Sequence, residues 1–245
     1  MRNQIVILAA GKGTRMGNSN VPKVLVMLKN KPLILYILEQ VEKINQLLKP
    51  IIVVGYMADK VRAVLGNDYT YALQKQQLGT AHAVMAALPY VEAENVLVLY
   101  GDMPFITAES LQSLMRAHHE KKSILSMFTA TVASFDGEFS SLYSYGRIIR
   151  DASGNITKSV ELKDATEEQK KITEVNPCIY MFNTPWLEKS LKLIQNTNNQ
   201  KEYYLTDLVE IAIRENIQIH SFPLDPREVI GVNSMEDLKK AESLF

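Results

Sequence analysis

The stretch at residues 8–23, LAAGKGTRMGNSNVPK, constrains this chain more than any other. It begins in an apolar run at residues 5–10, which predicts a short buried strand. A loop with Gly11, Gly13 and Gly17 follows at once. Glycine allows a backbone to turn sharply and to approach a ligand closely, because it has no Cβ atom. The sequence therefore predicts a strand that ends in a ligand-binding loop.

The same loop is positively charged. It carries Lys12, Arg15 and Lys23, whereas the first carboxylate of the chain is Glu39. Backbone amides and cations placed directly after a strand are typical of phosphate-binding loops. An ordinary glycine-rich turn with solvated lysines is the alternative, but it requires the glycines, the cations and the acid-free window to coincide by accident. We therefore predict a phosphate site.

Neither of the two common phosphate loops fits this stretch. The pattern G-x-x-x-x-G-K-[ST] is absent, and the dinucleotide pattern G-x-G-x-x-G fails because Met16 stands in place of its third glycine. The dinucleotide site also needs an acidic residue after the second strand, here predicted at residues 51–54. That strand is followed by Gly55 and Tyr56 instead.

Composition bounds the class of protein. The 245 residues are 47% hydrophobic, which is enough for one sizeable α/β domain with a small lobe. The 27 basic and 27 acidic residues leave no basic field, so we expect no nucleic acid partner. The single cysteine, Cys178, excludes an internal disulfide and fits a reducing compartment. The apolar N-terminal run is too short to span a membrane, so cytoplasm is the expected location, and the oligomeric state stays unknown.

Predicted strands alternate with predicted helices along the first half of the chain. Strands are expected at residues 51–54, 69–73 and 95–100, and helices from Pro32, over residues 59–65 and over residues 107–121. This alternation predicts a parallel sheet with right-handed crossovers. Ligands bind beyond the carboxyl ends of such strands. Because Gly11, Gln74 and Asp102 each follow a strand, we expect them to converge on one cleft.

LAAGKGTRM followed by PKVL resembles the signature of the sugar-phosphate nucleotidylyltransferases. The short spacer before Pro22 and Lys23 is most similar to the N-acetylglucosamine-1-phosphate uridylyltransferase domains of bifunctional enzymes in that family. Motifs at five further places extend the resemblance over nearly all of the chain: QKQQLGTAHA (74–83), YGDMP (100–104), YGRI (145–148), VELKDA (160–165) and EYYLTD (202–207).

The resemblance implies a fold. It is a Rossmann-like α/β domain with a mixed, mainly parallel sheet, flanked by helices, and a small sugar-binding lobe. Residues 1–245 would form this single domain. About residues 1–122 would be the nucleotide-binding half, about 123–233 the sugar-binding part, and 234–245 a C-terminal helix. The resembled enzymes continue into a β-helix acetyltransferase domain, of which these residues contain no part, so we expect no acetyl transfer from them.

The resemblance also implies a reaction. A sugar 1-phosphate would attack the α-phosphorus of UTP and release pyrophosphate. The acceptor that the resemblance implies is N-acetylglucosamine 1-phosphate. Such a step needs positioning and charge neutralisation more than acid–base help. Arg15 and Lys23 would be the catalytic residues. Arg15, with Lys12 nearby, would hold the leaving phosphates, and Lys23 would neutralise the reacting ones.

The implied nucleotide site comprises Leu8, Ala10, Gly11, Lys12, Gly13, Gln74, Gly79 and Thr80. The Gln74 amide suits the edge of a pyrimidine, but by itself it does not separate uracil from cytosine, because an amide can flip. Thr80 stands where a helix begins, so its hydroxyl is also predicted to cap that helix. His82 is interpreted as a packed surface histidine, not a catalytic base.

The implied cofactor is Mg²⁺, held by Asp102 and Asn233. A carboxylate at a strand end beside a phosphate loop suits magnesium, which takes few carboxylates plus substrate phosphates. Each residue also has a plain structural interpretation. Asp102 would start a turn before Pro104, and Asn233 would be an ordinary turn residue.

The implied sugar site comprises Tyr100, Gly101, Gly146, Glu161, Asn176 and Tyr204. One departure concerns the sugar itself. The family has Asn-Thr-Gly where this chain has Asn176, Pro177 and Cys178, inside an expected buried strand at residues 174–182. Cysteine adds a side chain where glycine lets the sugar approach, so glucose 1-phosphate would be disfavoured less than in the resembled enzymes. Two alternatives stay open: a transferase for CTP or another phosphate acceptor, and a non-catalytic nucleotide-binding relative.

Overall fold

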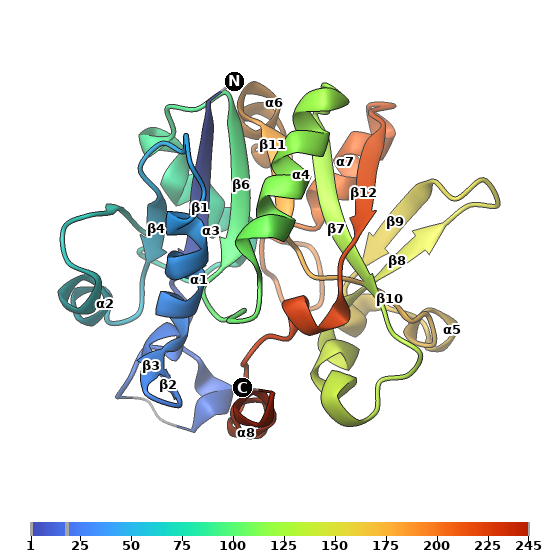
Figure 1. Ribbon diagram of the computed structural model, residues 1–245. Helices are drawn as coiled ribbons and strands as arrows, with labels where there is room; N and C mark the ends of the chain where they lie inside the picture. Colours follow the sequence, from blue (N-terminus) through green and yellow to red (C-terminus); the bar gives the residue numbers. More distant parts are fainter. Residues whose placement is uncertain (1, 18–19, 245) are drawn as a thin grey trace.

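The apolar runs of the sequence form one mixed sheet, and the computed structural model describes residues 2–17 and 20–244 (Figure 1). Asn18 and Ser19 of the glycine-rich loop and Phe245 of the expected C-terminal helix lie outside these ranges. The sheet runs in the order β5-β4-β1-β6-β11-β7-β10-β8-β9, with β12 beside β7. Its strands are β1 (Asn3–Ala9), β4 (Ile51–Val54), β5 (Thr70–Leu73), β6 (Asn95–Tyr100), β7 (Leu125–Thr131), β8 (Gly146–Arg150), β9 (Ile156–Val160), β10 (Glu174–Asn176), β11 (Tyr180–Asn183) and β12 (Ile219–Pro223).

The first half of the sheet is parallel. Strands β5, β4, β1 and β6 all pair in parallel, and antiparallel pairs begin where β11 joins β6. The predicted α/β fold, with a mixed sheet flanked by helices, is confirmed. The parallel strands all end at one edge of the sheet, so the loops that follow β1, β5 and β6 lie together there.

Helices cover both faces of the sheet, because alternate residues of the apolar strands point to opposite sides. Ile5 and Ile7 of β1 lie in the core that α1 and α4 share, whereas Val6 and Leu8 lie in the core with α3, α6 and α7. Figure 1 shows α1 and α4 in front of the sheet. The helices are α1 (Leu33–Glu42), α2 (Ala58–Leu65), α3 (Thr80–Ala87), α4 (Ala108–Glu120), α5 (Glu167–Lys170), α6 (Thr184–Leu191), α7 (Asp207–Arg214) and α8 (Met235–Ser243).

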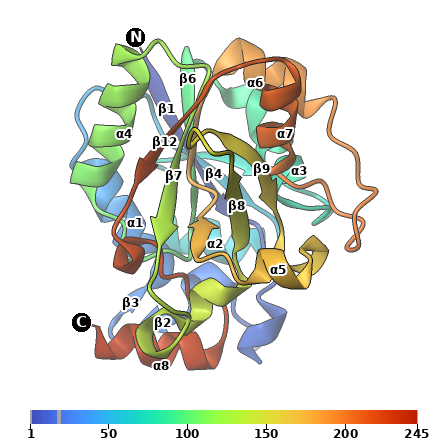
Figure 2. The ribbon, with the colours of Figure 1, turned by 90° about the vertical axis from the view of Figure 1, so that its right-hand side faces the viewer.

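Two smaller units complete the fold. The antiparallel hairpin β8–β9, with the short helix α5, forms a lobe at the end of the sheet (Figure 2). At the bottom of both views, α8 lies beside a two-stranded ribbon of β2 (Met27–Leu28) and β3 (Lys31–Pro32). Ser234 caps α8 by accepting a hydrogen bond from the Asp237 N–H.

The expected strand at residues 174–182 is wrong as a single strand. Strand β10 ends at Asn176 and β11 begins at Tyr180. Both pair with β7, but β10 also pairs with β8, whereas β11 also pairs with β6. Pro177 has no N–H to give to a ladder, and Cys178 adopts a left-handed conformation with φ of 59°. The chain therefore turns at Pro177 and Cys178. Between β7 and β8 the chain forms a 3-10 helix at Gly137–Ser144.

We predict that Gly79 is required by a close backbone approach. Gly79 (φ 115°, ψ 175°) and Gly66 (φ 74°, ψ −152°) both occupy a region that costs a residue with a side chain about 1–3 kcal/mol. A Cβ at Gly79 would also lie 2.5 Å from the carbonyl oxygen of Tyr203, whereas no described atom is within 4 Å of one at Gly66. Gly79→Ala should therefore lower Tm clearly more than Gly66→Ala in thermal unfolding. Equal losses would mean that the approach of residue 203 to α3 is not tight.

Candidate functional site

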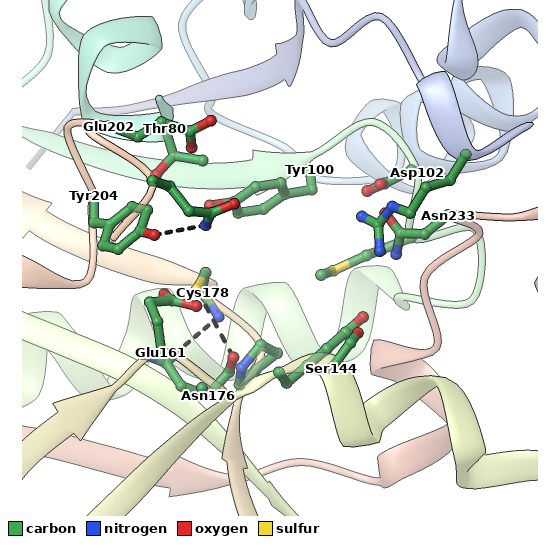
Figure 3. A pocket seen from close by; sticks show the side chains of 16 residues that line it. Thr80, Tyr100, Asp102, Ser144, Glu161, Asn176, Cys178, Glu202, Tyr204 and Asn233 are labelled. Atoms are coloured by element: carbon green, nitrogen blue, oxygen red, sulfur yellow. Dashed lines mark hydrogen bonds between the residues drawn. The ribbon is translucent and has the colours of Figure 1, made fainter. Parts of the chain in front are cut away.

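Two adjoining cavities open at the carboxyl ends of the parallel strands. One, of about 250 Å³, lies against the glycine-rich loop, and we name it the loop-side cavity. The other, of about 240 Å³, lies against the hairpin lobe, and we name it the lobe-side cavity (Figure 3). Both are lined by Thr80, Tyr100, Asp102 and Glu202, so they form one continuous cleft.

Residues that follow β1, β5 and β6 meet in the loop-side cavity. Its lining includes nine of the predicted site residues: Leu8, Ala10, Gly11, Lys23, Gln74, Gly79, Thr80, Tyr100 and Asp102. The predicted convergence of Gly11, Gln74 and Asp102 is confirmed, because all three line this cavity. Topology explains it, since parallel strands bring the starts of their loops to one edge of the sheet.

Lys12 and Gly13 line neither cavity, as far as the described residues define them. Gly13 has a different structural task. It adopts φ of 65°, and a Cβ there would lie 2.7 Å from the Lys23 Cβ. The missing side chain lets the loop pass directly over Lys23.

The Gln74 amide has a fixed orientation. Gln74 is 3% exposed, its Nε2 donates to the Gly79 carbonyl at 3.0 Å, and the same atom lies 3.1 Å from His82 Nδ1. A carbonyl oxygen can only accept, so the nitrogen must face Gly79, which settles the flip that the sequence leaves open. With both N–H groups directed to the protein, the amide offers a ligand its oxygen, an acceptor.

The predicted helix cap by Thr80 is wrong. Gly79 is the N-cap of α3, and no side chain caps it. The Thr80 hydroxyl instead accepts from the Leu205 N–H at 2.9 Å. Backbone bonds from Ala81 to Tyr203 and from Tyr203 to Leu78 run beside it. Thr80 thus ties the EYYLTD segment to the start of α3, a tertiary role that helix-start rules do not anticipate.

A three-residue contact lies where the two cavities meet. The Lys23 ammonium forms an ion pair with the Asp102 carboxylate and donates to Asn233 Oδ1 at 2.6 Å. The Lys23 and Asp102 side chains are only 17% and 10% exposed. Backbone contacts fix the partners, because Val232 N–H donates to the Asp102 carbonyl and Asn233 N–H donates to Asp237. Two side-chain oxygen atoms from distant segments therefore converge on one cation.

This convergence is the observation that tests the magnesium assignment. Asp102 and Asn233 supply hard oxygen atoms that already point at a single positive group, the Lys23 ammonium. Within residues 2–17 and 20–244, no cluster of three or more His, Cys, Asp or Glu side chains could hold a metal by itself. Magnesium often binds through one or two carboxylates plus substrate phosphates, so the residues present fit it.

The lobe-side cavity gathers five of the six residues of the predicted sugar site. Tyr100, Gly146, Glu161, Asn176 and Tyr204 line it, together with Arg15. Figure 3 shows Glu161, Cys178 and Asn176 on one side and Thr80, Glu202 and Tyr204 on the other. Gly101 lines neither cavity of the described structure. A Cβ there would lie 2.9 Å from Val24 Cγ1, so its absence makes room for packing.

Glu161 is a buried acceptor in this cavity. The Thr206 hydroxyl donates to its Oε1 at 2.9 Å. Burial raises the pKa of Glu161, and the Asp164 and Glu202 charges add to the rise. The carboxylate would gain from further hydrogen-bond donors, which a bound ligand with hydroxyl groups can provide.

Gln200 is a cavity residue that the sequence analysis missed. Its Nε2 donates to the Tyr204 hydroxyl at 2.5 Å, and the Lys163 ammonium donates to its Oε1. Asn198 shapes the loop around it through side-chain bonds to the backbone of Gln200 and Glu202. The asparagine-rich run NTNNQ was the available signal, because Asn side chains bond to nearby backbone and order turns.

Comparisons with known proteins agree with the fold and extend it. Residues 5–201 match the family described as the MobA-like NTP transferase domain. The bifunctional protein GlmU of Caldicellulosiruptor saccharolyticus is 42% identical over 245 residues, which cover 98% of this chain and 51% of that protein. GlmU of Carboxydothermus hydrogenoformans is 42% identical over 250 residues, covering 98% and 54%. The chain thus spans about half the length of the curated relatives it matches.

Solved structures share the fold at low sequence identity. Apo UDP-glucose pyrophosphorylase superposes with a TM-score of 0.80 at 18% identity, covering 100% of this chain and 98% of that one. A putative glucose-1-phosphate thymidylyltransferase from Bacillus anthracis, solved with sucrose, gives 0.79 at 17% identity, covering 99% and 94%. None of the helices in the described part of this chain is long and apolar enough to span a bilayer.

The carboxyl group of Asp207, the first residue of α7, generates a pH prediction. Burial raises the pKa of Asp207 to about 7, with Glu210, Glu161 and Asp164 contributing. The native state therefore holds this proton more tightly than the unfolded chain, and the stability it contributes is lost as pH rises through 7. Asp207→Asn should raise Tm at pH 8 by a few degrees, on the order of 2–4 °C per kcal/mol, and much less at pH 4.

Asp151 provides a control of opposite sign. Hydrogen bonds from Asn155 lower its pKa, so its contribution is present at neutral pH and lost on acidification. Asp151→Asn should lower Tm at pH 8. If Asp207→Asn raises Tm equally at both pH values, the carboxyl group is not protonated in the native state.

Proposed function

Because the chain belongs to the family of MobA-like NTP transferase domains, we propose that it transfers the uridylyl group of UTP to a sugar 1-phosphate, with N-acetylglucosamine 1-phosphate as the acceptor. The chain is a nucleotidyltransferase; its two substrates are what we propose. One observation carries the proposal. The loop-side and lobe-side cavities meet at Lys23, Asp102 and Asn233, so two substrates can face each other across a charged centre.

The loop-side cavity would hold the nucleotide. Gln74 presents an amide oxygen, and an acceptor suits the ring N3–H of uracil, which cytosine lacks. Gly11 would leave the loop backbone free to approach phosphate groups. Lys12 and Arg15 carry cations on the same loop, where they would hold the leaving pyrophosphate.

The lobe-side cavity would hold the sugar. Glu161 would accept hydrogen bonds from sugar hydroxyls, and the hydroxyl of Tyr204 and the amide of Gln200 lie across from it. The Gly146 backbone forms part of the lining. The acceptor assignment rests on the motifs of residues 145–148, 160–165 and 202–207, all of which contribute to this cavity.

The reaction would need little proton transfer, because the phosphate of the acceptor is already a nucleophile. Lys23 lies at the junction and can exchange Asp102 and Asn233 for the reacting phosphate oxygens when substrates bind. Asp102 and Asn233 would hold Mg²⁺, which would neutralise charge on those oxygens. Arg15 lines the lobe-side cavity, as Asp102 and Asn233 do, and would hold the leaving phosphates.

A panel assay tests the proposal. Pyrophosphate release is measured with UTP, CTP, dTTP and ATP against N-acetylglucosamine 1-phosphate, glucose 1-phosphate and an alcohol phosphate. Fastest release with UTP and a sugar 1-phosphate is expected. Fastest release with CTP would replace the nucleotide assignment, and no release with any pair would favour a non-catalytic binding protein.

Lys23→Ala should lower kcat far more than it weakens UTP binding. Its charge matters most as charge develops at the reacting phosphorus, so the loss should fall on the transition state. Steady-state kinetics combined with calorimetric UTP binding separate the two effects. Lys43→Ala, a lysine on the far end of α1, serves as the control. Wild-type turnover in Lys23→Ala would refute the role of Lys23.

Activity should require Mg²⁺, and Asp102→Asn should raise the concentration needed. Loss of a supporting partner of a metal ligand alone costs roughly 10–100-fold in affinity, so loss of a charged ligand should cost at least as much. Magnesium titrations of initial rate for wild type and Asp102→Asn measure the shift. Full activity in the presence of EDTA would show that the two oxygens serve Lys23 only.

A further inference from the structure

The side-chain amide nitrogen of Asn176 is fully used inside the protein. Asn176 is 1% exposed, and its Nδ2 donates to Ser159 Oγ at 2.8 Å and to the Tyr180 hydroxyl at 2.5 Å. An amide nitrogen carries two hydrogen atoms, so both are taken. Ser159 and Tyr180 are buried as well. Although Asn176 borders the lobe-side cavity, it has no N–H left to give to a sugar.

The amide oxygen of Asn176 holds the turn that follows it. Oδ1 accepts a hydrogen bond from the Cys178 N–H at 2.8 Å, across Pro177. Cys178 has φ of 59°, a conformation that residues with a side chain rarely adopt. Such a residue persists only where its surroundings hold it there. The bond to the Asn176 side-chain oxygen is a contact that does so, and the Cys178 thiol also lies 3.8 Å from the Asn176 carbonyl oxygen.

The turn places the Cys178 side chain in the cavity. Cys178 and Pro177 both line it, and Figure 3 shows Cys178 beside Glu161. Burial raises the pKa of the thiol, and the Glu161 charge adds to the rise, so the group stays neutral. A neutral thiol acts as a small hydrophobic group and a weak donor. At this point the cavity wall therefore offers bulk in place of polar recognition.

We propose that Asn176 is a positioning residue, not a sugar ligand. Its amide holds Cys178 in the left-handed conformation, and Cys178 sets the size of the substituent that a sugar 1-phosphate can carry against this wall. The inference rests on the proposed function and refines its acceptor. The site would still take N-acetylglucosamine 1-phosphate, but with Cys178 in the wall it would favour an acetamido group over a hydroxyl group less than it would with glycine there.

Kinetics with two acceptors test the role of Cys178. The ratio of kcat/KM for N-acetylglucosamine 1-phosphate to that for glucose 1-phosphate is measured with UTP. Cys178→Gly should raise this ratio roughly 10–200-fold, the range for single-group steric changes in a pocket. Cys178→Ser, the closest match in size, should keep it. An unchanged ratio in Cys178→Gly would overturn the proposal, and so would an equal shift in Cys178→Ser.

Two substitutions of Asn176 separate positioning from direct binding. Asn176→Asp keeps an oxygen for the Cys178 N–H, and the Ser159 and Tyr180 hydroxyls can donate to it in turn. It should therefore preserve the sugar ratio, whereas Asn176→Ala should change it. If instead both variants raise KM for both sugars equally, with KM for UTP unchanged, the amide donates to the sugar and the proposal fails.

Thermal unfolding tests the turn without any turnover. Glycine tolerates φ of 59° unaided, so Asn176→Ala should lower Tm less in the Cys178→Gly background than in the wild type. Equal losses in both backgrounds would show that Asn176 does not hold the turn. If the wild type uses no sugar 1-phosphate, the proposed function is wrong. The comparison of Tm losses in the two backgrounds would still decide the positioning role of Asn176.

Discussion

The contact of the Lys23 ammonium with Asp102 and Asn233 is the interaction on which the cleft depends. It joins the glycine-rich loop, the end of β6 and the segment before α8, which are far apart in sequence. At its centre, a lysine balances a mostly buried carboxylate. A buried charge is costly without a partner, so the three segments are held together until anionic substrates offer Lys23 other oxygens. The junction of the two cavities is thus set by electrostatics as much as by packing.

The central layers could be predicted because local pattern and tertiary structure agree there. The continuous apolar runs of β1, β4 and β6 predict strands covered on both faces, and alternate residues do enter two separate cores. Prediction fails where a distant partner decides. Thr80 looks like a helix cap, yet its hydroxyl serves Leu205, which is 125 residues away. The run at residues 174–182 is mostly apolar, yet the turn at Pro177 and Cys178 divides it into two strands.

The same distinction, between local pattern and distant partners, separates the site residues that could be predicted from those that could not. Gly11, Gln74 and Asp102 could be brought together from sequence, because topology alone places strand ends at one edge. Gln200 could not, because its position depends on Asn198 folding the loop and on the bond from Lys163 in another segment. The orientation of the Gln74 amide could not be predicted from the sequence either. It follows from the Gly79 carbonyl, and it decides what a bound base would meet.

A motif match does not separate ligand-binding residues from the residues that shape the site. Arg147, in the YGRI motif, is fully buried, and its guanidinium donates to the carbonyl groups of Tyr143 and Tyr145 while it lies over the Phe135 ring. It holds the long loop before β8 against the lobe, which brings Tyr145 to the cavity wall. Gly101 also shapes the site, because its missing side chain makes room for Val24. One motif can contain both ligand-binding residues and residues that shape the site, because a binding contact is only as well placed as the scaffold behind it.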